Sequence, residues 1–184
     1  MATKNQTFTA IKRKSDKNIS LMNNKKLKLI SASSLKKSTF DNSNINKLVI
    51  KHSTLTESHF RKCNLMSASI DHSDMAKVDF TWSNLKANKF YRANFKGSHL
   101  EFVDLSEAVV KECCFKNASL RWSKFNITYF ENCDLSKADL SNADLSTAKF
   151  INCNLKGAKF NINTKLPFDI EIAKDHKMNF LGVQ

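Results

Sequence analysis

The sequence predicts an all-β solenoid, and three observations lead to this fold class. Every position divisible by five from residue 35 to residue 160 holds Leu, Ile, Val, Met or Phe, which gives 26 consecutive large apolar residues. The position two residues before each of them is small or short in almost every repeat, with Leu48 and Asn88 as the clear exceptions. The other three positions are mostly Lys, Asn, Asp, Ser and Glu. An internal repeat is the signature of a solenoid or another repeat architecture.

A period of five fits neither a helix nor a flat strand. On an α-helix, five residues advance by about 500°, so successive apolar side chains would point roughly 140° apart. On a strand, they would alternate between the two faces. The chain keeps them on one side only if it turns a corner once per repeat. We therefore expect a tube with the fifth residues inside and the small residues where little interior volume is left.

The repeats resemble those of the pentapeptide-repeat family, whose consensus is A(D/N)LXX. The likeness is clearest in residues 138–147, Ala-Asp-Leu-Ser-Asn-Ala-Asp-Leu-Ser-Thr, and in residues 153–158, Cys-Asn-Leu-Lys-Gly-Ala. It covers residues 33–162 and implies a right-handed quadrilateral β-helix with four repeats per coil. Twenty-six repeats then make six to seven coils, and neighbouring strand spacing gives a rod roughly 31 Å long.

The solenoid is expected to span residues 31–163, after a basic arm at residues 1–30. The arm carries eight Lys and Arg residues against Asp16 alone, and its apolar residues lack the register of five. We expect it to be partly disordered, with its first ten or so residues least ordered, or to cap the first coil with a strand at residues 27–30.

Residues 164–184 are expected to form a C-terminal cap with a short helix. The register breaks at Lys165, and Pro167 followed by Asp169 indicates the start of a helix over about residues 169–178. A solenoid end exposes backbone and core, so a cap is expected there. Some members of the family use such a helix to dimerise, which leaves a homodimer open.

Cysteine usage in a sequence without a secretory signal favours a reducing compartment. No apolar run approaches the roughly 20 residues of a membrane span, and the polar N-terminus is no secretory signal. We expect a cytoplasmic bacterial protein, with delivery into a host cell as the alternative. Four of the five cysteines occupy the small interior site, and only Cys114 is expected to point outward, so the pattern predicts neither a metal site nor another cofactor.

Both tryptophans fall in one outward column. With four repeats per coil, Trp82, Phe102 and Trp122 lie one above another. Exposed aromatic stripes usually mark interfaces, so these three residues are the predicted partner-binding site. Three occupants are possible: the chain's own arm or tail, a second copy, or another protein.

A different wall is basic. Its lysines share two neighbouring columns, in which Glu57 is the only acidic residue: Lys36, Lys96, Lys116 and Lys156 in one, Lys37, Lys77 and Lys137 in the other. Such columns could bind the phosphates of nucleic acid or anionic lipid heads. The alternative is a surface that only keeps the rod soluble.

Catalysis is not expected. His59, Asp79, His99 and Ser119 share a column and imitate a triad in composition, but a flat wall supplies neither a substrate pocket nor oxyanion donors. We therefore predict a non-enzymatic protein-interaction module.

The alternative function is a nucleic-acid-associated protein, or one that modulates DNA gyrase or another topoisomerase through its lysine columns. The resemblance suggests the topoisomerase, because fluoroquinolone-resistance members of the family protect it with acidic, DNA-like surfaces. Residues 31–163 carry 19 basic and 13 acidic residues, and a positive rod mimics a polyanion poorly.

Overall fold

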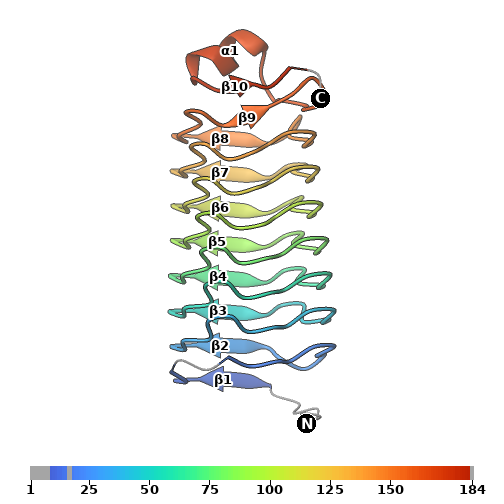
Figure 1. Cartoon of the computed structure of the whole chain (residues 1–184), viewed down its shortest axis with the longest axis vertical. Helices are drawn as coiled ribbons and strands as arrows, with labels where there is room; N and C mark the ends of the chain where they lie inside the picture. Colours follow the sequence, from blue (N-terminus) through green and yellow to red (C-terminus); the bar gives the residue numbers. More distant parts are fainter. Residues whose placement is uncertain (1–8, 16–17, 183–184) are drawn as a thin grey trace.

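The chain winds into a parallel β-solenoid of about eight turns, with one short strand of the main sheet in each turn (Figure 1). This computed structural model describes residues 9–15 and 18–182. The main sheet contains β1 (Ala10–Lys12), β2 (Leu29–Ser31), β3 (Val49–Lys51), β4 (Ser69–Asp71), β5 (Lys89–Tyr91), β6 (Val109–Lys111), β7 (Tyr129–Glu131) and β8 (Lys149–Ile151). At the C-terminal end follow β9 (Lys159–Phe160), α1 (Ile170–Asp175) and β10 (Asn179–Phe180).

Each regular coil consists of four repeats and has four sides. Ile50 pairs with Ile70 on the side formed by β3 and β4. Isolated parallel bridges mark the other three sides, for example 54 with 74, 59 with 79 and 64 with 84. The predicted quadrilateral solenoid is therefore confirmed.

The interior is filled as the register predicts. The apolar residue at the centre of nearly every side is buried, and phenylalanines of successive coils stack: the ring centroids of Phe40 and Phe60 are 4.4 Å apart, and those of Phe60 and Phe80 are 5.2 Å apart. Serines at the small interior site satisfy the backbone, as when the Ser58 hydroxyl donates to the Leu35 carbonyl at 2.8 Å. Asn88 is also buried, and its Oδ1 accepts the Ala68 N–H at 2.8 Å.

The corners require an unusual backbone. The second residue of nearly every corner has a positive φ, for example 55° at Lys37, 65° at Trp82 and 57° at Ile127. This left-handed region costs energy for residues other than Gly, Asn and Asp. It persists because the hydrogen-bonded coils above and below fix each corner.

The solenoid begins earlier than residue 31, which corrects the expected boundary and the coil count. β1 and β2 pair in the main sheet, and Ile11 and Leu21 are buried in the first coil. That coil is one residue short, because Ala10 pairs with Leu29. Because of this shortening, Ile11 and Leu21 lie one position after a multiple of five. The register of five therefore does not identify the first coil in the sequence. Of the first ten or so residues, which were expected to be the least ordered, residues 1–8 lie outside the described residues and Ala10 begins β1.

An asparagine closes the shortened coil. Oδ1 of Asn24 accepts the N–H groups of Lys26 and Leu27, each at 2.8 Å, and Asn24 itself is buried. These bonds replace backbone partners where the chain cannot complete a regular corner.

The C-terminal segment covers the last coil. Asp144 pairs with Lys165, one residue later than a regular coil would give, so the register breaks where the sequence predicts. Helix α1 is shorter than the expected 169–178 and buries Ala173, while Phe168 packs against Phe150 at 6.5 Å between ring centroids. β10 then pairs in parallel with β9, so the chain rejoins the coil path. In the described part of the chain, no helix has the length and hydropathy needed to span a bilayer.

Candidate functional site

Trp82, Phe102 and Trp122 lie one above another on a corner of the rod and are here called the aromatic ridge. Their rings are nearly parallel: the Trp82 and Phe102 centroids are 4.1 Å apart at 2°, and those of Phe102 and Trp122 are 6.1 Å apart at 5°. The three residues are 58%, 39% and 49% exposed, respectively. The described arm and tail therefore leave the ridge open, and the predicted column exists.

The ridge is built from positions that elsewhere carry polar residues. The same corner position holds Asn42, Lys62 and Asn142 in other coils. At the ridge, bulky rings adopt positive φ values of 57° to 65°, although such residues are rare in this region. Folding alone therefore does not require aromatic residues here.

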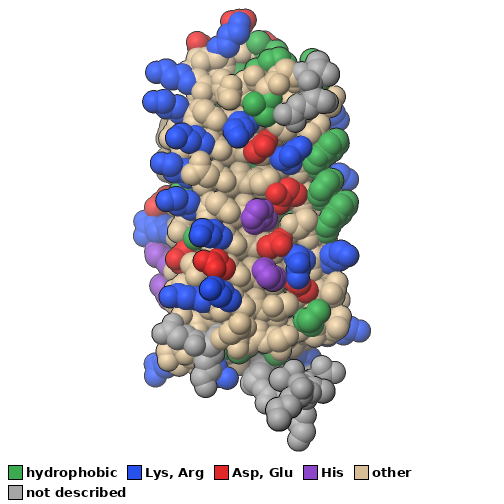
Figure 2. Space-filling model, viewed as in Figure 1, with side chains coloured by type: hydrophobic (Ala, Val, Ile, Leu, Met, Phe, Trp, Pro, Cys, Tyr) green, Lys and Arg blue, Asp and Glu red, His purple; other side chains and the backbone are tan. Residues whose placement is uncertain are grey.

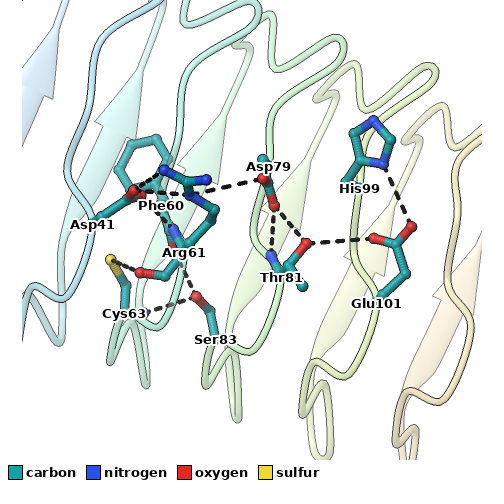
Figure 3. Close-up of polar contacts among 9 residues, drawn as sticks. All are labelled: Asp41, Phe60, Arg61, Cys63, Asp79, Thr81, Ser83, His99 and Glu101. Atoms are coloured by element: carbon teal, nitrogen blue, oxygen red, sulfur yellow. Dashed lines mark hydrogen bonds and ion pairs between the residues drawn. The ribbon is translucent and has the colours of Figure 1, made fainter.

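A polar network lies on the side that precedes the ridge (Figure 3). Asp41 accepts two hydrogen bonds from the Arg61 guanidinium, at 2.6 and 2.8 Å, and one from the Arg61 N–H at 2.8 Å. These hydrogen bonds and the charge of Asp41 raise the pKa of Arg61 above its ordinary value. The Asp79 carboxylate lies 3.9 Å from the same guanidinium.

The network continues along the rod to the next two coils. Asp79 accepts both the hydroxyl and the N–H of Thr81, at 2.6 and 2.9 Å, and Thr81 also lies 3.5 Å from Glu101. Glu101 pairs with His99 at 3.4 Å (Figure 3). These contacts fix the side chains beside the ridge.

The triad-like residues share a column but do not form a relay. Backbone bridges stack His59, Asp79, His99 and Ser119 in successive coils. The side-chain contacts run sideways instead: Asp79 contacts Thr81, and His99 contacts Glu101. This arrangement orients no base toward the Ser119 hydroxyl, which nucleophilic catalysis would need.

The predicted basic residues also lie together, on the corner one side away from the ridge. Figure 2 shows hydrophobic side chains along one edge of the rod and Lys and Arg side chains along the opposite edge. Glu57 lies between Lys37 and Lys77, at 3.7 and 3.9 Å from their amines. All seven predicted lysines are exposed: Lys36, Lys37, Lys77, Lys96, Lys116, Lys137 and Lys156.

The structure adds one lysine that the repeat pattern missed. The Gly157 N–H donates to the carbonyl of Lys177 at 2.7 Å, so Lys177 occupies the next level of the same corner. Helix α1 interrupts the repeat before it, which hid the position. The spacing between Gly157 and Lys177 equals one regular coil, and this spacing could have revealed the position from the sequence.

The cysteines lie mostly inside the tube. Burial raises the pKa of the Cys63 and Cys113 thiols to about 12. Cys133 is also buried, whereas Cys153 is only half-buried. A hydrogen bond between these two thiols raises the pKa of Cys133 and lowers that of Cys153. Among the described residues, His, Cys, Asp and Glu form no group of three or more that could hold a metal ion.

Comparison with known proteins identifies the repeats. A family model described as pentapeptide repeats matches eight copies, over residues 50–86, 89–126 and 128–161. A comparison with curated protein sequences found no match.

Solved structures with the same repeat architecture resemble the chain only distantly. A trypsin-treated variant of QnrB1, a plasmid-mediated fluoroquinolone resistance protein, is 13% identical with a TM-score of 0.49, covering 93% of this chain and 88% of that one. HetL, which is involved in heterocyst differentiation regulation in Nostoc sp. strain PCC 7120, is 17% identical with a TM-score of 0.43, covering 81% of each chain. At these levels, neither likeness bears on a partner or an activity of this protein.

Proposed function

Because the chain belongs to the pentapeptide-repeat family, whose model matches more than half of its length, we propose that it is a non-enzymatic protein-interaction module. It acts as a rigid rod that binds another protein through the aromatic ridge. The observation that carries this proposal is the exposure of three stacked aromatic rings at a corner where neighbouring coils carry Asn or Lys.

The ridge offers enough apolar surface to anchor an interface. A Trp or Phe side chain buries about 150–250 Å² when covered, so three half-exposed rings offer roughly 300 Å². At ~25 cal/mol per Å², covering them contributes about 7 kcal/mol before the costs of association. Interfaces concentrate binding energy in a few such residues, especially Trp, and surround them with weaker contacts.

The ridge is also rigid before binding. Its three backbone N–H groups donate to carbonyls of the coil above, at 3.0 to 3.1 Å, and the rings stack on one another. Binding at this surface therefore costs little conformational entropy, because its side chains and backbone are already ordered. Such preorganisation favours affinity, because ordering costs are part of the free energy of association.

Charges beside the ridge give the interface an orientation. In the sequence, Phe102 lies between Glu101 and Asp104, whereas Trp122 of the next coil lies between Arg121 and Lys124. A partner that covers both coils needs a cationic group opposite the first pair and an anionic group opposite the second. Complementarity of this kind fixes register and excludes wrong partners more than it adds affinity.

A nuclease-treated pull-down with three baits tests the proposal. The baits are the wild type, Trp82→Ala/Trp122→Ala, and Ile127→Ala, whose side chain is 70% exposed on a different corner. The lysate comes from the organism that encodes the chain and contains about 0.5 M salt, where exposed charges are screened within a few Å. We expect wild type and Ile127→Ala to capture the same protein and the double variant to lose it.

Circular dichroism first establishes that all three baits are folded. Identical capture by all three, or capture by none, contradicts the proposal. Capture of the chain itself, confirmed by sedimentation of the purified protein, would mean that the ridge binds a second copy instead.

A further inference from the structure

The lysine side chains form a continuous line along one corner of the rod, here called the lysine corner. Each of six successive coil levels contributes one lysine to it: Lys77, Lys96, Lys116, Lys137, Lys156 and Lys177. Backbone hydrogen bonds connect the levels, as from the Lys77 N–H to the Lys96 carbonyl at 2.9 Å. Five steps of about 4.8 Å make this line roughly 24 Å long.

The charges on the upper part of this line are not neutralised by the protein. Glu57 contacts Lys77 from the level below. Within the described part of the chain, none of the next five lysines of the corner makes an ion pair or a hydrogen bond through its amine. Lysines elsewhere on the rod do pair, as Lys86 does with Glu107 at 3.0 Å and Lys111 with Glu131 at 2.7 Å.

Both glycines of the repeat region lie on this corner, under the stems of lysines from the preceding coil. Gly97 and Gly157 have φ values of +64° and +71°. A Cβ at Gly157 would come within 3.4 Å of Cγ of Lys137, and one at Gly97 within 3.7 Å of Cγ of Lys77. Both distances are ordinary van der Waals contacts, so the glycines serve the positive φ of their corners and the lysine stems pack directly over them.

Acidic residues on the adjoining sides confine an anion to the corner. Asp74 and Asp134 lie on one side, and Asp79 and Asp139 lie on the other. A flat anionic membrane would have to approach these carboxylates together with the lysines. A narrow polyanion can contact the lysines directly while approaching fewer of these carboxylates than a flat surface must.

We infer that the lysine corner binds the phosphate backbone of nucleic acid without reading its sequence. The corner presents one cation per about 4.8 Å, and one strand of a duplex presents a phosphate every 3.4 Å or so. The aromatic ridge lies on a different corner, and its Trp82 and Phe102 rings are only 4.1 Å apart, which leaves no space for a base between them. Binding therefore rests on charge and on the release of counterions.

The salt dependence of binding tests this inference. Fluorescence anisotropy of a dye-labelled duplex of about 20 base pairs gives the slope of log K against log salt, for which five phosphate contacts predict about −4.5. A quadruple variant removes four of the five contacts: Lys96→Gln/Lys116→Gln/Lys137→Gln/Lys156→Gln. It should change the slope to about −1 and lower the affinity at low salt by a factor of about 100 or more. The control Lys47→Gln/Lys51→Gln/Lys89→Gln/Lys149→Gln loses the same formal charge from other walls and should keep the wild-type slope.

A gain of binding provides a second test that misfolding cannot imitate. Glu57→Gln frees Lys37 and Lys77, so it should strengthen binding and steepen the slope by about 1 to 2. The same measurement with the labelled single strand shows whether the protein prefers single-stranded or duplex nucleic acid. For five contacts with a single strand, the slope of log K against log salt should be near −3.5. Equal losses in both quadruple variants, no binding of either nucleic acid at low salt, or tighter binding to phosphatidylserine vesicles than to both would overturn the inference.

Discussion

At the scale of the residue, position inside or outside the tube decides what each side chain does. Cys113 and Cys133 stack in the interior column and are buried, whereas Cys153, one coil beyond Cys133 in the same column, is half-buried. We therefore expect the same residue type to differ in reactivity along one line of the structure. Thiolate formation controls that reactivity, and burial opposes it.

Alkylation of the folded protein should separate these thiols. We expect iodoacetamide at mild alkaline pH to modify Cys153 well before Cys113, because burial raises the pKa of Cys113 to about 12 while the hydrogen bond from Cys133 lowers the pKa of Cys153. Peptide mass spectrometry over time measures both rates. The unfolded protein is the control, in which the two thiols should react at similar rates. Equal rates in the folded protein would contradict the burial described here.

At the scale of the element, the first coil shows how a solenoid tolerates an irregular repeat. β1 joins the main sheet although the coil between β1 and β2 is one residue short. The Asn24 side chain supplies hydrogen bonds that the shortened corner loses. Since each coil contacts only its neighbours, damage here should stay local.

Replacing Asn24 with Ala should loosen the first coil. The change leaves the N–H groups of Lys26 and Leu27 without their acceptor, which costs about 1–3 kcal/mol for a buried group. Hydrogen exchange should accelerate in β1 and remain unchanged in β5. The matched control is Asn42→Ala at a regular corner. The backbone N–H of residue 42 donates to the Arg61 carbonyl, and this hydrogen bond does not depend on the replaced side chain. Uniform acceleration along the rod would contradict a local role.

At the scale of the whole molecule, the repeat determines what can be predicted from sequence. A strict period of five predicts the interior positions, and the offset of one full coil predicts that Trp82, Phe102 and Trp122 share one column. The first coil was missed because a one-residue shortening moved Ile11 and Leu21 out of register. Lys177 was missed because α1 interrupts the period.

The identity of the partner depends on different physics from the fold. The period determines which residues face outward, but recognition depends on the shape and charge of a second molecule. Under the proposed function, the exposed rings and their flanking charges favour a partner with an apolar centre and charges of both signs. The repeat itself carries no motif from which the identity of a partner could be read.

Site-specific photocrosslinking from the ridge tests the central claim most directly. A benzoyl-phenylalanine replaces Phe102 in one variant and Ile127, on a different corner, in the other. Irradiation in nuclease-treated lysate at high salt should yield one discrete protein adduct from position 102 and none from position 127. The same adducts from both positions, or none from either, would contradict a protein-binding role for the aromatic ridge.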